Sequence, residues 1–204
     1  MSKTVEHWDR VYSTKRETEV SWYQPHAERS LALIRTAAPD RSASILDVGG
    51  GASRLVDELL ALGYGDLTVL DVSQAALKRS MERLGAAAYK VSWIAADITQ
   101  WTPARTWDIW HDRAVFHFLT EAKDQEIYVA ALEAATKPGS TAIISTFALN
   151  GPERCSGLPV QRYSPATLAA RIGSKFQTVS EACEAHLTPT GSIQNFTYVV
   201  LKRT

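Results

Sequence analysis

Beyond Asp40, short apolar runs alternate with longer segments whose apolar residues recur at helical spacing. This pattern predicts strands at residues 44–48, 67–72, 90–97, 107–114 and 140–148, and helices at residues 52–63, 73–85, 121–139 and 164–173. Because helices alternate with strands, right-handed crossovers should produce a parallel sheet covered by helices on both faces.

The end of the chain follows a different pattern. Residues 176–186 and 194–203 both have strand character, and only a turn around residues 188–191 separates them. Without a helix between them, these two strands should form an antiparallel hairpin. The expected fold is therefore α/β: a doubly wound, mostly parallel seven-stranded sheet with a C-terminal antiparallel hairpin.

The first 40 residues predict helices rather than strands. Apolar residues at helical spacing indicate helices at residues 2–13 and 24–37, joined by the loop segment TEVSWYQP at residues 18–25. A chain of 204 residues is most simply one domain. We therefore expect a single domain over residues 1–204, with a helical N-terminal part over 1–40 and an α/β core over 41–204.

Composition narrows the class of partner. Lysine plus arginine and aspartate plus glutamate both number 22, so the net charge of zero weighs against a nucleic-acid partner. The two cysteines form no disulfide framework, and the chain starts with no apolar signal region. No apolar run approaches the length of a membrane span. These features predict a cytoplasmic protein with no membrane partner.

Three glycines follow the first predicted strand in the segment ILDVGGGAS, residues 45–53. Such a bare-backbone corner suits a nucleotide phosphate, a nucleoside-bearing amino acid or simply a sharp turn in a sheet. A dinucleotide fingerprint would need glycine where Arg54 stands, and no Gly-Lys-Ser or Gly-Lys-Thr of a phosphate-binding loop follows.

Acidic residues stand at the ends of three successive predicted strands. Asp47 ends the first strand, Asp71 the second and Asp97 the third. The carboxyl ends of parallel strands share one edge of the sheet, where ligands bind in open α/β folds. A carboxylate such as Asp71 accepts hydrogen bonds from the two hydroxyls of a ribose.

Taken together, these segments resemble the class I S-adenosylmethionine-dependent methyltransferases, which have a Rossmann-like fold. ILDVGGGAS resembles their first motif, VLDVS their ribose-binding segment, AADI their adenine-binding segment, and the closing hairpin their terminal strand pair. The resemblance covers roughly residues 44–203. One departure is Ser53, which stands where many members have glycine.

The resemblance implies S-adenosyl-L-methionine as cofactor and S-adenosyl-L-homocysteine as product. It implies Asp47 near the methionyl ammonium, Asp71 on the ribose hydroxyls, and Asp97 with the Ile98 backbone on the adenine. The full set of cofactor-binding residues that it implies is Trp22, Asp47, Gly49, Gly51, Ser53, Asp71, Val72, Asp97, Ile98 and Asp112.

The fourth predicted strand resembles one branch of this family. DIWHDRAVFHFL, HWDRVY and WYQ are similar to segments of bacterial small-molecule methyltransferases and eukaryotic protein-lysine methyltransferases. In that branch the N-terminal helices cover the cofactor, which implies Trp22 and Tyr23 as parts of a lid. The alternative for both residues is plain packing of a helix.

Candidate acceptor-site residues lie near the carboxyl edge of the sheet. His111, Asp112 and Arg113 stand at the end of the fourth predicted strand, and His186 lies in the hairpin; we take these as the catalytic candidates. Packing histidines and a salt-bridged strand end are the alternatives. Cys155, in the loop after the fifth strand, is more simply an ordinary thiol. No close pair of His or Cys residues suggests a metal.

The expected function is methyl transfer from S-adenosylmethionine to a small nucleophilic acceptor: a thiol, another chalcogen nucleophile or an amine. No Asn/Asp-Pro-Pro-Tyr/Phe segment for a nucleobase amine follows the fourth strand. A protein-lysine methyltransferase is the alternative enzyme. A non-catalytic cofactor-binding module that serves a partner is the alternative from another class. The sequence leaves the oligomeric state open.

Overall fold

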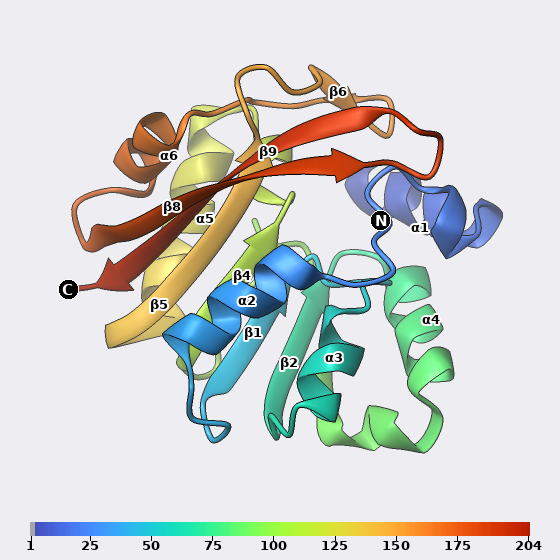
Figure 1. Ribbon diagram of the computed structural model, residues 1–204, viewed down its shortest axis with the longest axis horizontal. Coiled ribbons are helices and arrows are strands. Elements are labelled where there is room, and N and C mark those ends of the chain that lie inside the picture. The colour runs from blue at the N-terminus through green and yellow to red at the C-terminus, as the bar shows by residue number, and fades with distance from the viewer. Residues whose placement is uncertain (1–2) are drawn as a thin grey trace.

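The computed structural model describes residues 3–204 and is built on one seven-stranded sheet (Figure 1). Its strands, in the order β3-β2-β1-β4-β5-β9-β8, are β3 (Val91–Ala95), β2 (Asp66–Asp71), β1 (Ser44–Val48), β4 (Trp107–Arg113), β5 (Thr136–Phe147), β9 (Ile193–Arg203) and β8 (Phe176–Leu187). Every pairing from β3 to β5 is parallel, and β9 is antiparallel to both of its neighbours. The expected fold, including the C-terminal hairpin, is confirmed.

Helices cover both faces of this sheet. The helices are α1 (Lys3–Thr14), α2 (Glu28–Ala37), α3 (Leu55–Ala61), α4 (Gln74–Leu84), α5 (Ala122–Ala134) and α6 (Pro165–Ile172). Within residues 3–204, none of them has the length and apolar character needed to cross a membrane.

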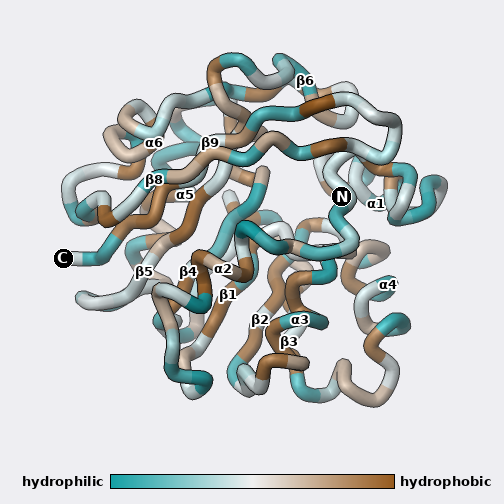
Figure 2. The backbone as a smooth tube through the Cα atoms, viewed as in Figure 1, coloured by the Kyte–Doolittle hydropathy of each residue, from teal (hydrophilic) through white to brown (hydrophobic). Residues whose placement is uncertain are grey.

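Two hydrophobic cores lie on opposite faces because side chains alternate along each strand. Ile45 packs with α2 and α3, whereas its neighbour Leu46 packs with α5 and α6. The same alternation holds for Ile109 and Trp110 on β4. Figure 2 shows β1, β2 and β4 as the hydrophobic centre of the molecule. Strands buried on both faces explain the continuous apolar runs in the sequence.

Local signals place several helix ends. The Ser73 hydroxyl accepts the Ala76 N–H at 3.1 Å and begins α4. Ser164 accepts the Thr167 N–H at 3.2 Å and begins α6, with Pro165 in its first turn. Side-chain oxygens at these positions satisfy amide groups that have no partner inside the helix.

Three expectations need correction. α5 ends at Ala134, and Pro138 and Gly139 lie inside β5 rather than ending a helix. Pro138 and Gly139 lie where the β4–β5 register shifts, between the pairs Trp107–Thr136 and Ile109–Thr141. Because these two residues have no partner on β4, the missing N–H of the proline interrupts no β4–β5 residue pair. α2 begins at Glu28 rather than at residue 24.

The third correction concerns the loop after β5. It contains a small antiparallel pair, β6 (Arg154–Cys155) and β7 (Leu158–Pro159), that the sequence pattern did not predict. At the other end of the chain, the predicted helix over 2–13 corresponds to α1, and residue 2 lies outside the described residues.

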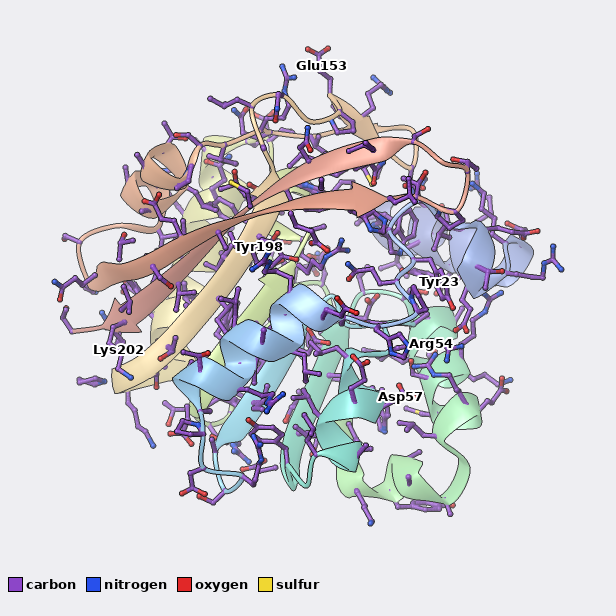
Figure 3. All side chains as sticks on the ribbon, in the orientation of Figure 1. Tyr23, Arg54, Asp57, Glu153, Tyr198 and Lys202 are labelled. Atoms are coloured by element: carbon purple, nitrogen blue, oxygen red, sulfur yellow. The ribbon has the colours of Figure 1, made fainter. Side chains whose placement is uncertain are left out.

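Polar contacts dock α1 and the segment after it against α3 and α4. Asp9 accepts the Ser73 hydroxyl at 2.6 Å and the Ala75 N–H at 3.2 Å at the start of α4. Glu17 forms ion pairs with Arg54 and Arg83. Figure 3 shows Arg54 beneath Tyr23 and close to Asp57. The N-terminal segment is thereby held over the carboxyl edge of the sheet.

A buried hydrogen-bonded chain supports the turn after β4. Trp110 Nε1 donates to the Tyr128 hydroxyl at 2.9 Å, and that hydroxyl donates to Asp112 Oδ2 at 2.6 Å. Burial is the main cause that raises the pKa of Asp112 to about 6, although the Tyr128 hydrogen bond and the backbone hydrogen bonds act in the opposite direction.

Replacement of Tyr128 by phenylalanine should destabilise the fold. The change leaves the Trp110 N–H without its acceptor and takes one donor from the Asp112 carboxylate, which should cost about 1–3 kcal/mol. Urea unfolding followed by circular dichroism measures the difference. Tyr89→Phe, at a side chain that is 95% exposed, is the matched control and should change little. Equal losses in the two variants would contradict this account.

Candidate functional site

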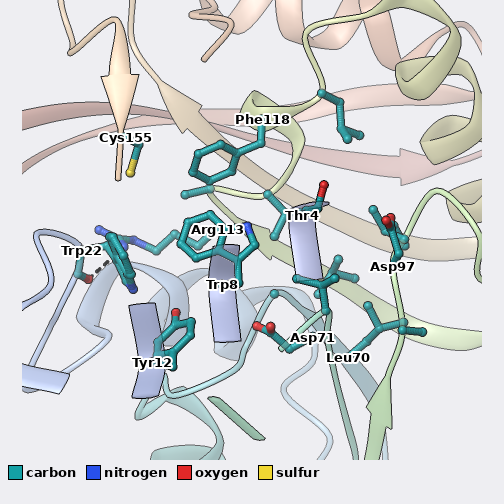
Figure 4. A pocket seen from close by; sticks show the side chains of 18 of the residues that line it. Thr4, Trp8, Tyr12, Trp22, Leu70, Asp71, Asp97, Arg113, Phe118 and Cys155 are labelled. Atoms are coloured by element: carbon teal, nitrogen blue, oxygen red, sulfur yellow. Dashed lines mark hydrogen bonds between the residues drawn. The ribbon is translucent and has the colours of Figure 1, made fainter. Parts of the chain in front are cut away.

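Two hollows meet above the carboxyl edge of the sheet, and both are lined by Gly49, Trp22 and Arg113. We call the first the long pocket. It extends from the ends of β2 and β3 to a region that we call the aromatic chamber, lined by Trp8, Trp22, Phe118, Phe147 and Phe196. We call the second the polar pocket; among its lining residues are Ser30, Asp47, Arg54 and His111. Figure 4 shows Asp97 at one side of the long pocket and Trp22 with Cys155 at the opposite side.

The glycine corner allows this close approach. Gly49 has φ of +70°, and a Cβ placed there would lie 2.0 Å from Val115 Cγ2. A Cβ at Gly51 would lie 2.5 Å from Asp71 Oδ2. Any side chain at either position would strain the backbone and collide with the pocket wall. The corner is thus required by the geometry of the site and not only by the turn.

Asp71 is a buried carboxylate on the wall of the long pocket. Its Oδ1 accepts the Ser73 N–H at 2.8 Å. Burial raises the pKa of Asp71 to about 7; the Ser73 hydrogen bond opposes this rise, and the nearby carboxylates of Asp47 and Asp9 add to it. A ligand that brings hydroxyl donors would stabilise the ionised carboxylate here.

The end of β3 supplies the far wall of the long pocket. Val72, Asp97 and Ile98 all line it. Asp97 Oδ1 accepts both the N–H and the hydroxyl of Thr99, at 2.9 and 2.7 Å, which fixes the carboxylate in a short turn. The expected gathering of Asp71 and Asp97 around one cleft is therefore observed.

The polar pocket contains a buried row of three polar side chains. His111 on β4 lies opposite Asp47 on β1 in the parallel register. His111 Nδ1 is 2.7 Å from Asp47 Oδ1, and Nε2 is 2.8 Å from the Ser30 hydroxyl on α2. Within residues 3–204, Asp47 Oδ2 is buried and has no hydrogen-bond partner. The polar pocket thus has a free carboxylate oxygen in its wall.

Asp112 and His186 lie apart from both pockets. The oxygens of Asp112 accept the N–H groups of Val115 and Phe116, at 2.8 and 3.1 Å, in addition to the Tyr128 hydroxyl. His186 Nε2 is 2.7 Å from the Ser21 carbonyl oxygen, and burial lowers the pKa of His186. Neither residue lines the long pocket or the polar pocket.

Ser53, another expected cofactor residue, lines the polar pocket. Its hydroxyl accepts the Leu55 N–H at 3.1 Å at the start of α3. Trp22, the expected lid residue, lines both pockets and packs edge-on against Trp8, with ring centroids 5.6 Å apart.

The aromatic chamber was not predicted from the sequence. Trp8 comes from α1, Phe118 from the turn after β4, Phe147 from β5 and Phe196 from β9. Trp8, Phe147 and Phe196 belong to elements that the apolar pattern marks and Phe118 to none, and nothing in the pattern indicates that these four side chains converge. Cys155, expected to be an ordinary loop thiol, is buried and lines the same pocket; burial raises its pKa to about 12.

The arrangement suits a ligand with a cationic group and vicinal hydroxyls. The free oxygen of Asp47 is a buried acceptor for a cation in the polar pocket, and Asp71 is an acceptor for hydroxyls in the long pocket. S-adenosylmethionine has both features, with an ammonium at its methionyl end and a ribose diol in its centre. The residues present therefore fit this cofactor.

Residues 45–139 match the model of the methyltransferase domain family. The eEF1A lysine and N-terminal methyltransferase of Mus musculus is 27% identical over 97 residues, a match that covers 48% of this chain but only 14% of that protein. This chain thus spans a small part of the length of its curated relative.

Two solved structures have the same fold. The N-methyltransferase NodS of Bradyrhizobium japonicum, in complex with S-adenosylhomocysteine, has a TM-score of 0.75 and 17% identity and covers 99% of each chain. The 1,6-didemethyltoxoflavin-N1-methyltransferase of Burkholderia thailandensis, with its acceptor and S-adenosylhomocysteine bound, has a TM-score of 0.71 and 17% identity and covers 98% of this chain and 84% of that one. Residues 45–139 are thus similar to the methyltransferase domain family, and the whole chain has the fold of these methyltransferases.

Proposed function

We propose that this enzyme transfers a methyl group to a small nucleophilic acceptor: a thiol, another chalcogen nucleophile or an amine. The observation that carries the proposal is the aromatic chamber, which adjoins the cofactor cleft and is covered by α1. Its aromatic walls and the cover of α1 favour a small acceptor enclosed by side chains over an extended chain lying in an open groove.

We assign the cofactor to the two pockets as follows. The adenine lies against Val72, Asp97 and Ile98, and the ribose hydroxyls donate to Asp71. The methionyl end enters the polar pocket, where the ammonium meets the free oxygen of Asp47. When bound, S-adenosylmethionine supplies an electrophilic methyl group. The remaining cofactor residues in this assignment are Gly49, Gly51, Ser53 and Trp22.

The expected catalytic residues divide into two kinds. Arg113 lines both pockets, so it stands beside the place where methionyl end and acceptor meet. His111 contacts Asp47 and Ser30, and we assign it as a positioning residue for the Asp47 carboxylate. Asp112 and His186 are assigned structural roles, Asp112 in the turn after β4 and His186 against the Ser21 carbonyl.

The chain's contribution to the reaction is alignment and exclusion of water. α1, through Trp8, and Trp22 in the segment before α2 cover the junction of the two pockets, so a bound acceptor faces the methyl group in a water-poor space. We assign the N-terminal part of the chain, through α2, as this cover. Its ion pairs to α3 and α4 keep it in place.

A protein-lysine acceptor is the second candidate, and the name of the mouse relative supports it. A lysine must lose its proton before transfer, so this candidate needs a base near the methyl group. Among the described residues, the chamber wall holds neither a histidine nor a carboxylate on the side away from Asp71 and Asp97. A non-catalytic cofactor-binding module remains the candidate from another class.

The affinity for S-adenosylhomocysteine should rise with pH. Since burial raises the pKa of Asp71 to about 7, the carboxyl is largely protonated below that pH and loses its full acceptor strength. Binding to the ionised form alone predicts about a tenfold gain in affinity between pH 6 and pH 8, levelling off above. Calorimetry on the wild type measures this profile.

The Asp71→Asn variant should bind S-adenosylhomocysteine more weakly than the wild type, and its affinity should not change between pH 6 and pH 8. Asp66→Asn, at the half-buried start of the same strand, is the matched control and should keep the profile of the wild type. A wild-type profile that is flat from pH 6 to pH 8 would contradict the assigned role of Asp71.

A His111→Gln variant should weaken binding of the amino-acid end of the cofactor without affecting binding of the adenosine end. Loss of the hydrogen bond to the Asp47 carboxylate should weaken S-adenosylhomocysteine binding about tenfold. 5′-Methylthioadenosine, which lacks the amino-acid end, should bind as in the wild type. His111→Asn, whose amide N–H stands near the Nδ1 position, should retain most of the affinity. Equal weakening of both ligands by His111→Gln would argue against the positioning role.

Methyl-labelled S-adenosylmethionine incubated with the enzyme and a cell lysate tests the class of acceptor. We expect label in the low-molecular-weight fraction, because the aromatic chamber encloses a small molecule. Label confined to protein would support the lysine alternative. Binding of S-adenosylhomocysteine with no label transferred to either fraction would favour the non-catalytic module. The Asp71→Asn variant serves as the background.

A further inference from the structure

We infer that the acceptor reacts as an anionic sulfur, a thiolate carried on a flat apolar body, and that Arg113 recognises it. This inference rests on the proposed function and names the acceptor class of the same site. It follows from the position of Arg113 at the aromatic chamber, from the lack of a base among the described residues there, and from the aromatic walls.

Arg113 is the charged group of the chamber. Among the described residues that line the long pocket, the carboxylates are Asp71 and Asp97; Asp97 lies on the side opposite Trp22 and Cys155, and Asp71 lies between the two sides. The guanidinium stacks over Phe196, with Cζ 4.4 Å from the ring centroid. A cationic acceptor such as a lysine ammonium would be repelled here, whereas an anion would be attracted.

The guanidinium is fixed but keeps a free donor. Arg113 Nε donates to the Tyr198 hydroxyl at 3.1 Å, and Nη1 donates to the Trp22 carbonyl at 3.4 Å. Nη2 is 3.5 Å from Glu184 and has no hydrogen-bond partner among residues 3–204. Glu184 is itself engaged by the Tyr198 hydroxyl at 2.7 Å and by Gln24 at 2.5 Å. Because Glu184 accepts hydrogen bonds from these other donors, the Nη2 group of Arg113 can donate to a ligand.

Nearby groups cannot serve as a general base. His117 lies four residues after Arg113, in the turn that follows β4. Burial, together with the Arg113 charge, lowers the pKa of His117 to about 3. Its Nδ1 accepts the Phe147 N–H at 3.3 Å. Cys155 is held as a neutral thiol by burial. The acceptor must consequently bring its own free electron pair.

Thiols meet this requirement better than other nucleophiles. A thiol has a reference pKa near 8.5, against about 10 for a phenol and 10.4 for a lysine amine, and its anion is intrinsically the strongest nucleophile of the three. Arg113 lowers the pKa of a bound thiol further by favouring its anion. The aromatic walls, with Phe147 and Phe196 centroids 4.8 Å apart, suit a flat apolar body behind the sulfur.

No proton moves during the methyl transfer itself. The thiolate's electron pair forms the new bond to the methyl carbon while the bond from that carbon to the sulfonium breaks, and its electron pair stays on the cofactor's sulfur. One anion and one cation give two neutral thioethers. The proton of the thiol leaves to solvent before the transfer, when the acceptor binds beside Arg113.

Binding of three molecules of one shape to the enzyme saturated with S-adenosylhomocysteine tests the inference. Benzenethiol, phenol and aniline are titrated by calorimetry and by quenching of tryptophan fluorescence, since Trp8 and Trp22 line the chamber. Benzenethiol should bind at least about tenfold more tightly than the other two. Its affinity should rise as the pH passes through the pKa of the thiol.

Arg113→Gln should remove the preference for benzenethiol, and Arg113→Lys, which keeps the charge, should retain part of it. Arg154→Gln, an exposed arginine next to Cys155 on β6, is the matched control and should leave the preference unchanged.

Wild-type enzyme that prefers aniline or phenol, or whose affinity for benzenethiol falls as the thiol ionises, would overturn the inference even if the variants failed to fold. Failure of the proposed function is distinguishable, since it would appear as no binding of S-adenosylhomocysteine or as label transferred only to protein.

Discussion

The site depends on one buried carboxylate, that of Asp112. Its oxygens accept the Tyr128 hydroxyl and the N–H groups of Val115 and Phe116, and so fix the turn that follows β4. Within that turn Ala114 has φ of +74°, a conformation that costs an L-residue roughly 1–2 kcal/mol. The hydrogen bonds offset this strain. The turn then presses Val115 against Gly49 and aims Arg113 and Phe118 at the pocket.

The N-terminal segment completes what the sheet begins. The strands supply the glycine corner and the acids, but Trp8, Tyr12 and Trp22, which close the long pocket, all precede β1. Their position is set by polar contacts at fixed points, such as Asp9 at the N-terminus of α4. A carboxylate at that helix end also meets the free N–H groups of the first turn. The N-terminal segment is thus docked on α4, the helix that follows the strand ending at Asp71.

The sequence predicts the sheet and the acid positions because both are local signals. Apolar runs mark strands buried on two faces, and Asp71 and Asp97 stand at strand ends that any parallel sheet brings together. The aromatic chamber could not be predicted, because its side chains come from α1, β5, β9 and the turn after β4, and only packing brings them together. His111 illustrates the same limit: its register opposite Asp47 makes it a partner of that carboxylate, which no spacing reveals. The prediction that Pro138 ends a helix was wrong, because the register shift between β4 and β5 accommodates a proline inside β5.

The charges along the two pockets are arranged so that they favour one orientation of the bound reactants. Asp47 and Asp71 are buried carboxylates in the pocket walls, and Arg113 is a cation at the junction of the two pockets. A sulfonium between them would be attracted toward the acids and repelled from the guanidinium, while an anionic acceptor would be held on the other side. The neutral net charge of the chain hides this arrangement, because charges of both signs cancel in the sum. Low polarity in a covered site strengthens each interaction, so a few fixed charges determine which reactants meet and in which orientation.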